Sequence, residues 1–135
     1  MGKINWARVF LCGILTGGVL YLLTLAVFVF ALPETELRRV VEATGRPING
    51  PLHAGLYVLV GIWTMWLYAA IRPRYGPGPK TAAVAGFAVW LLGSWADAVW
   101  ASLGVIPPGV LVAPVAAALP VIILAAVVGA WPYKE

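Results

Sequence analysis

Four long apolar runs account for most of this 135-residue chain and constrain its fold more than any other feature. The hydrocarbon core of a bilayer is about 30 Å thick, and a helix crosses it with roughly 20 apolar residues. Because 62% of the residues are hydrophobic and only 10% are charged, lipid is the expected solvent. The runs predict an all-α, integral membrane four-helix bundle that forms a single transmembrane domain over residues 1–135. The predicted helices span 4–32, 51–72, 81–106 and 109–130.

A short amphipathic helix is predicted at 34–45, between the first and second spanning helices. Leu37, Val40 and Val41 recur at helical spacing, while charged residues occupy the other face. Gly45 suits the left-handed position that ends many helices. This pattern is typical of a helix that lies in the membrane interface, here on the extracytoplasmic side.

Prolines set the other expected helix ends. The second spanning helix is predicted to end at Arg72, because Pro73 disfavours helical geometry in the residue before it. Residues 72–80 contain three prolines and two glycines, which predict a stiff, solvated connection. Pro114 and Pro120 lie inside the fourth helix, where a kink is expected, since neighbouring helices can satisfy the carbonyl groups that proline frees.

The basic residues predict the orientation of the chain. One side of a four-helix topology collects Lys3, Arg8, Arg72, Arg74, Lys80 and Lys134. The other side has three arginines, offset by three glutamates, and a turn without charge. Because basic residues are enriched in cytoplasmic loops, both termini are predicted in the cytoplasm. The net charge of +4 fits contact with anionic lipid and gives no argument for a nucleic-acid partner.

Three segments carry a resemblance to a known group of proteins: 4–9 (INWARV), 66–81 (WLYAAIRPRYGPGPKT) and 129–135 (GAWPYKE). Together they resemble a group of small bacterial membrane proteins with four helices and no assigned reaction. The resemblance covers nearly the whole chain and implies this fold and a bacterial cytoplasmic (inner) membrane. In that group the outer half of helix one often carries a glutamate and an asparagine, whereas this chain has Leu22, Leu23 and Thr24, which implies that this member lacks the polar site.

Asp97 is the only acidic residue inside a predicted spanning segment. A charged side chain at such depth costs about 2.5–3.5 kcal/mol on insertion scales, so a compensating feature is expected. One interpretation is a proton relay or a polar ligand site; the other is a protonated or hydrogen-bonded aspartate that locks helices together. Helix rise places Asp97 roughly 14 Å deep, near Thr24 and Tyr57. Ser94 and Trp100 are expected beside it on its own helix.

His53 is the only histidine and Cys12 the only cysteine. A neutral imidazole near the outer end of helix two could ligate a haem iron or a chlorophyll magnesium, or exchange a proton with Asp97. No second histidine, cysteine cluster or carboxylate pair completes a metal site within one chain. The favoured interpretation is therefore a structural or interfacial histidine, with no metal site and no cofactor required by the sequence.

Small residues are spaced for close helix packing. Gly13 and Gly17 form a small-xxx-small face on helix one, and Ala82 and Gly86 form a similar face on helix three. These faces allow two helices to approach closely, either inside the bundle or against another subunit.

Three functions fit these features. No Ser-His-Asp set, nucleophile elbow, zinc motif or nucleotide fingerprint appears, so no catalytic residue is predicted and the chain is not expected to be an enzyme. The leading hypothesis is a membrane subunit or scaffold that packs against a larger membrane complex or against copies of itself. One alternative is a bundle that binds a hydrophobic ligand or pigment through His53 and the tryptophans. Another is a small proton-coupled transporter or channel centred on Asp97.

Overall fold

Helices make up nearly all of the computed structural model, which describes residues 4–31 and 36–133. In those residues the backbone forms α-helices, one short π-helical segment and no strand. The elements are α1 (Trp6–Ala26), η1 (Val27–Ala31), α2 (Glu36–Ala43), α3 (Gly50–Tyr75), α4 (Pro79–Ser102) and α5 (Pro108–Ala130). Four helices, of which the first joins α1 to η1, are long and apolar enough to cross a membrane. The all-helical class is confirmed, and the four candidate spans indicate a multi-pass membrane protein.

Local sequence signals explain where the spanning helices begin. The side-chain oxygen of Asn5 accepts a hydrogen bond from the backbone N–H of Arg8 at 3.1 Å. Asn49 accepts one from the backbone N–H of Leu52, also at 3.1 Å. Both asparagines act as N-caps and satisfy a donor that the first helical turn leaves open. α4 and α5 instead begin with proline, whose missing N–H costs nothing in the first turn.

The end of α3 differs from its prediction. An end at Arg72 is wrong, because the helix continues through Pro73 to Tyr75. Pro73 lies in the last turn, where its missing N–H removes a single backbone hydrogen bond. The backbone N–H of Gly76 still donates to the Arg72 carbonyl at 2.8 Å. Gly76 has a positive φ of 83° and ends the helix.

The end of α4 also differs, since the helix stops before the predicted end at residue 106. Gly104 has a φ of 71°, which turns the chain out of the helix. Its N–H donates to the Ala101 carbonyl at 3.0 Å, and the N–H of Val105 donates to the Trp100 carbonyl at 3.1 Å. This pair of bonds is a Schellman motif. The predicted end was wrong because the residues around Gly104 are apolar and extend the hydrophobic run past the turn.

The short helix α2 lies within the predicted range 34–45, whose first two residues are outside the described part of the chain. Gly45 has a φ of 60°, so the predicted left-handed position is confirmed. Leu32, at the predicted end of helix one, and Lys3 and Lys134, which entered the charge count, also lie outside the described residues.

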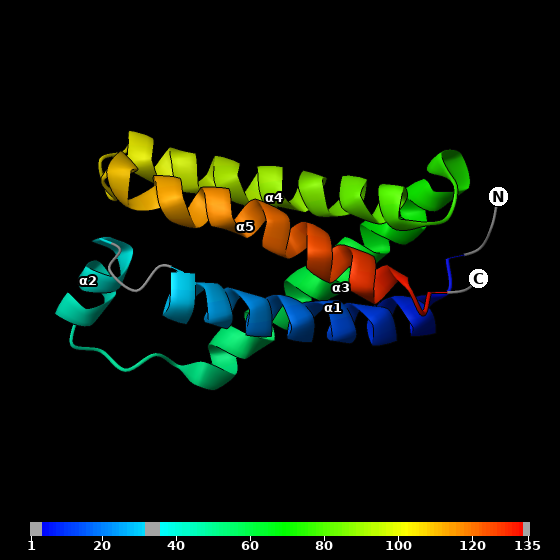
Figure 1. Ribbon diagram of the computed structural model, residues 1–135, viewed down its shortest axis with the longest axis horizontal. Coiled ribbons are helices and arrows are strands. Elements are labelled where there is room, and N and C mark those ends of the chain that lie inside the picture. The colour runs from blue at the N-terminus through cyan, green and yellow to red at the C-terminus, as the bar shows by residue number, and fades with distance from the viewer. Residues whose placement is uncertain (1–3, 32–35, 134–135) are drawn as a thin grey trace.

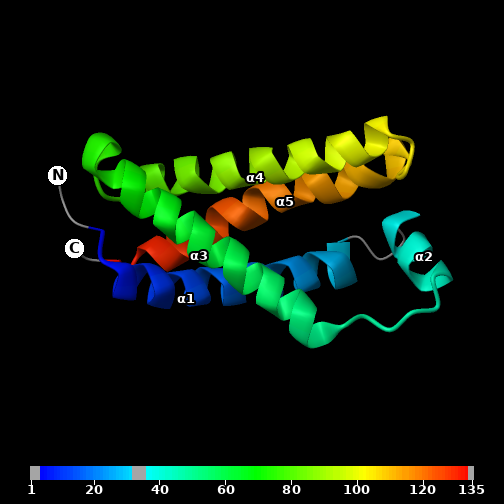
Figure 2. The same cartoon turned by 180° about the vertical axis from the view of Figure 1, so that it is seen from behind.

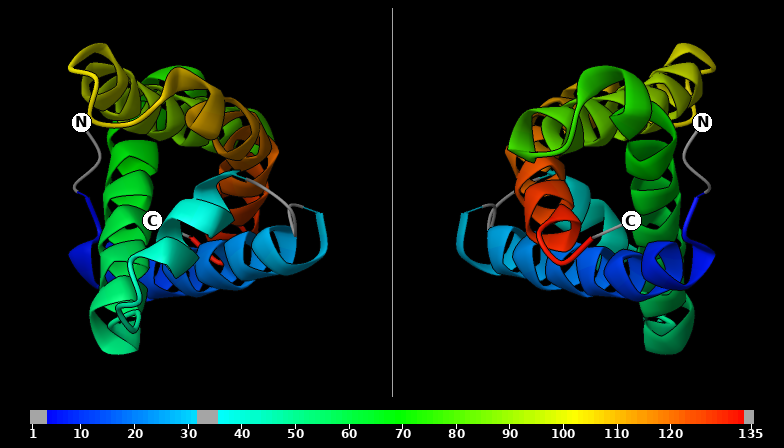
Figure 3. Two further views of the ribbon diagram at one scale, coloured as in Figure 1. Left: turned by 90° about the vertical axis from the view of Figure 1, so that its left-hand side faces the viewer. Right: turned by 90° about the vertical axis from the view of Figure 1, so that its right-hand side faces the viewer.

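The four spanning helices surround the bundle axis in the order α1, α3, α4, α5. Each contacts the next, and α5 closes the ring by contacting α1. Figure 3 shows this ring from both ends. α4 and α5 run side by side, whereas α3 crosses α1 and α5 at a steep angle, behind them in Figure 1 and in front of them in Figure 2. Because α3 crosses its neighbours steeply, the four helices pack tightly only where their axes come close together.

The helices pack closely at the end of the bundle that holds both chain ends and the α3–α4 turn (Figure 1). This closed half is defined by one cluster of buried side chains. Its members are Val9, Cys12, Met65, Tyr68, Ala69, Ala82, Ala85, Ala126, Ala130 and Tyr133. Towards α2 and the α4–α5 turn the helices diverge (Figure 2). We call this part, around Thr24, His53, Asp97 and Leu111, the open half.

Glycines bring α1 and α3 into backbone contact. A Cβ atom on Gly13 would lie 2.5 Å from the Cα of Ile62, and one on Gly17 would lie 2.6 Å from the Cα of Val58. Gly61 of α3 faces both glycines. The small-residue face of α1 is therefore used inside the chain.

The second small-residue face is also internal. Ala82 is fully buried in the core of the closed half. A Cβ atom on Gly86 would lie 3.2 Å from the Cβ of Ala126 and 3.3 Å from the Cα of Ile123, both in α5. The predicted faces thus hold α1 to α3 and α4 to α5.

Candidate functional site

A cavity of about 740 Å³ lies in the open half, between α1, α3, α4 and α5. Most of its wall consists of aliphatic side chains. Its volume falls within the range of about 300–1,000 Å³ that is typical of small-molecule sites. The polar side chains that line it come from three helices: Tyr21 and Thr24 of α1, His53 and Tyr57 of α3, and Ser94 and Asp97 of α4.

This cavity unites most of the side chains that the sequence singled out as a ligand or proton site. Asp97, Ser94, His53, Tyr57 and Thr24 all line it. Trp100 does not line it, and its side chain is 52% exposed. The expectation that Trp100 lies beside Asp97 stays a prediction, and the structure places Trp100 in the last turn of α4, outside the cavity lining.

Three aromatic rings form a cluster in the cavity wall. The ring centroids of Tyr21 and His53 lie 5.9 Å apart, those of Tyr21 and Tyr57 5.5 Å, and those of His53 and Tyr57 5.1 Å. The rings meet edge to face, an arrangement that their quadrupoles favour. Tyr21 was not among the predicted site residues. Its spacing of three residues from Thr24 is the signal that places both on one face of α1.

Asp97 faces the cavity with its carboxylate only partly buried. In the described part of the chain, no side chain donates a hydrogen bond to it and no lysine or arginine lines the same cavity. The structural interpretation required a partner that locks α4 to its neighbours, and no such contact is present among these residues. The carboxylate is thus available to a molecule that enters the cavity.

Trp90 ties the two helices of the α4–α5 pair together beside the cavity. Its indole N–H donates to the backbone carbonyl of Val115 at 2.9 Å. The next carbonyl along α5, that of Ala116, has no helical donor because Pro120 lacks an N–H. α5 nevertheless continues through Pro114 and Pro120. Trp90 also lines the cavity.

α2 lies across the open end of the bundle, as the left view of Figure 3 shows. Val41 of α2 and Ile48 of the following segment both line the cavity. Arg38 and Glu42 form an ion pair at 2.8 Å, and their side chains are largely exposed. α2 therefore contributes an apolar residue to the cavity and carries charged groups on its surface.

His53 and Asp97 are the two side chains in this cavity that could ligate a metal ion. Among the described residues, no three histidine, cysteine, aspartate or glutamate side chains come together in a group that could hold a metal ion. His53 is exposed near the start of α3 and contacts two tyrosine rings. His53 therefore contributes an aromatic ring to the cavity wall.

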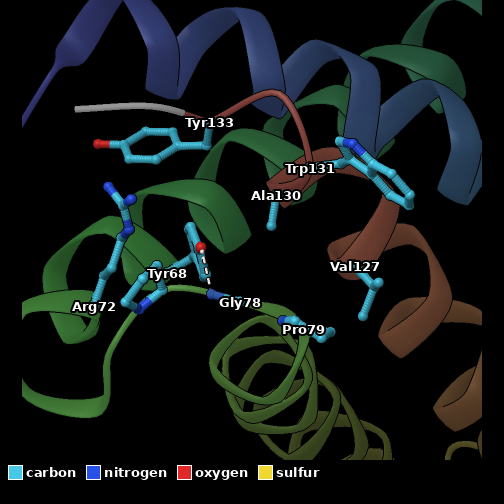
Figure 4. A pocket seen from close by; sticks show the side chains of 9 residues that line it. Tyr68, Arg72, Gly78, Pro79, Val127, Ala130, Trp131 and Tyr133 are labelled. Carbon is cyan, nitrogen blue, oxygen red and sulfur yellow. Dashed lines mark hydrogen bonds between the residues drawn. The ribbon is translucent and has the colours of Figure 1, made fainter.

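A second cavity, of about 520 Å³, lies in the closed half near the α3–α4 turn. Figure 4 shows the guanidinium of Arg72 beside the ring of Tyr133, with 5.4 Å from its central carbon to the ring centroid. The hydroxyl of Tyr68 accepts a hydrogen bond from the backbone N–H of Gly78 at 3.3 Å (Figure 4). Arg8 donates to the carbonyl of Pro132 at 3.0 Å. These contacts anchor the C-terminal segment and the turn to the bundle.

Comparisons of the chain with protein-family models, with curated proteins and with solved structures found no match. The resemblance to small bacterial membrane proteins therefore stays a prediction.

Proposed function

We propose that the chain is a non-enzymatic membrane protein that binds an amphipathic, lipid-soluble small molecule in the cavity of the open half. The observation that carries this proposal is a cavity of about 740 Å³, mostly apolar, whose polar side chains converge from α1, α3 and α4. This combination of an apolar wall and a few convergent polar groups is typical of small-molecule sites.

Packing supports the same function. Protein interiors are close-packed, with few voids larger than a water molecule. The core cluster of the closed half follows this rule, with Val9, Met65 and Tyr68 almost wholly enclosed. The open half instead contains the larger of the two cavities, of about 740 Å³. An apolar molecule or acyl chain that fills the cavity would restore the lost dispersion contacts.

The other two functions draw less support from the structure. The scaffold hypothesis rested on small-residue faces, and those faces are used between helices of this chain. A transporter needs a path to both membrane surfaces, and the packed core of the closed half interrupts that path. Ligand binding in the open half requires no path through the closed half.

The proposed location is a bacterial inner membrane, with both termini and the closed half on the cytoplasmic side. The support is the count of basic residues around the α3–α4 turn and near the termini. The open half then faces the outer leaflet, so the ligand would enter from that leaflet. Lipid is the expected surrounding partner, and no second protein subunit is required for the cavity to form.

The test is native mass spectrometry of the protein purified in a mild detergent. Two neighbouring alanines of α5 supply matched variants: Ala117 lines the cavity, whereas Ala116 is exposed and does not. Ala117→Trp should lower the retained lipid-soluble ligand by about tenfold, because the indole occupies the binding volume, and Ala116→Trp should leave it unchanged. Equal retention in both variants, or no retained ligand in the unmodified protein, would overturn the proposal. An absorption spectrum of the same sample separates a pigment from a colourless lipid.

A further inference from the structure

From the charge in the cavity we infer that the ligand carries a positively charged ammonium group at its polar end, held by Asp97 and by the aromatic rings of the cavity. This inference rests on the proposed function, since it names the chemical class of the molecule that the cavity binds.

The charge of Asp97 complements a cationic ligand. Asp97 is the only acidic residue on the four spanning helices, and in the described residues neither lysine nor arginine lines its cavity. A carboxylate with no opposite charge is costly in apolar surroundings, whereas a paired one is tolerated. A cationic ligand would supply the missing charge, and an anionic ligand would add repulsion.

The aromatic rings in the cavity wall also favour an ammonium group. Tyr21, His53 and Tyr57 meet edge to face, with ring centroids between 5.1 and 5.9 Å apart, and Trp90 lines the same cavity. The faces of aromatic rings attract ammonium groups, and tryptophan and tyrosine do so most strongly. Desolvation strengthens this attraction, and the rest of the cavity wall is largely aliphatic.

The size and the apolar wall of the cavity indicate the chemistry of the remainder of the ligand. A volume of about 740 Å³ exceeds what an ammonium group alone would fill, and the wall away from the polar groups is apolar. The matching molecule is therefore an ammonium group attached to a long hydrocarbon body. A free lipophilic cation and the ammonium head of a membrane lipid share this chemistry.

The experiment compares four photoactivatable probes that share one C16 chain with a diazirine and differ only in the polar end. The ends are trimethylammonium, phosphocholine, hydroxyl and carboxylate. Each probe is crosslinked to the full chain in dodecyl maltoside micelles, whose heads are uncharged. Mass spectrometry then compares labelling of cavity-lining segments with labelling of the exposed residues Leu91 and Leu92.

The trimethylammonium probe should label the cavity about tenfold more than the hydroxyl and carboxylate probes. Asp97→Asn should abolish this preference and Asp97→Glu should keep much of it, because only the second variant retains the charge. Strong labelling by the phosphocholine probe as well would support the inference with a lipid head as the source, and labelling by the trimethylammonium probe alone would support it with a free cation.

Equal labelling of the cavity by the ammonium, hydroxyl and carboxylate probes would overturn the inference and leave the proposed function standing. No labelling of the cavity by any probe would overturn both. The comparison among probes uses the unmodified chain, so it decides the question even if a variant of Asp97 fails to fold.

Discussion

Gly61 of α3 lies directly on Gly17 of α1: a Cβ atom added to Gly61 would come within 2.7 Å of the Gly17 Cα. No side chain separates the two backbones at this point. The crossing of α1 and α3 therefore depends on the absence of a side chain at two positions far apart in the sequence. This contact fixes the distance between the two helices that carry the aromatic cluster.

Gly61→Ala should destabilise the fold by about 1–3 kcal/mol, because the added methyl group overpacks a contact between backbones. Gly18→Ala is the matched control, since a Cβ atom there meets nothing within 4 Å. Thermal unfolding in dodecyl maltoside measures both. Equal melting temperatures for the two variants would contradict the packing described for α1 and α3.

The Cys12 thiol should resist modification by a maleimide until the bundle unfolds, because the side chain is only 2% exposed. The measurement is the labelling rate in mild detergent and again in a denaturing detergent. A cysteine placed at the exposed Tyr75 in a Cys12→Ala background is the control and should react in both. Rapid labelling of native Cys12 would show that the closed half is not packed as described.

Trp90→Phe should cost roughly 0.6 kcal/mol and at most about 1.7 kcal/mol, the average and the maximum for interhelical hydrogen bonds in a membrane protein, because it removes the donor to the Val115 carbonyl. Trp95→Phe should have little effect, since that side chain is 67% exposed. Unfolding by a denaturing detergent compares the two variants. If both lose the same stability, the hydrogen bond does not hold α4 to α5.

Gly104→Ala should cost about 1–2 kcal/mol, because a residue with a Cβ atom is strained in the left-handed region that Gly104 occupies. Gly109→Ala lies within α5 and should be neutral or slightly stabilising, as alanine is the better helix former. The midpoint of unfolding reports both changes. Loss of stability confined to Gly109→Ala would contradict the assignment of the α4–α5 turn.

The proposed orientation predicts which side of the membrane each connection occupies. In a Cys12→Ala background, Arg46→Cys should react with a membrane-impermeant maleimide in intact cells, whereas Arg74→Cys should react only after the membrane is opened. Both positions are exposed in the structure, so a difference in reaction reflects the side of the membrane. The reverse pattern would invert the topology.

Hydropathy and local turn chemistry determined the helical part of this protein. Each spanning helix coincides with an apolar run long enough to cross a bilayer, and Gly45 takes the left-handed conformation that its position predicted. Asp97 stood out because an acid in such a run is costly. These features depend on residues close together in the chain, which is why one sequence was enough to find them.

The tertiary structure decided how these helices face one another. Apolar side chains surround each spanning helix, so periodicity did not reveal which side meets a neighbour and which meets lipid. The sequence did not reveal whether Gly13 and Gly17 pack against α3 or against another subunit. It also did not reveal that Tyr21 shares a cavity with Asp97. The backbone contact between Gly61 and Gly17 sets how closely α3 approaches α1, and these two helices carry Tyr21, His53 and Tyr57. The physical reason is that lipid and protein interior are almost equally apolar, so hydropathy does not distinguish them, and close packing and interhelical hydrogen bonds select the interfaces.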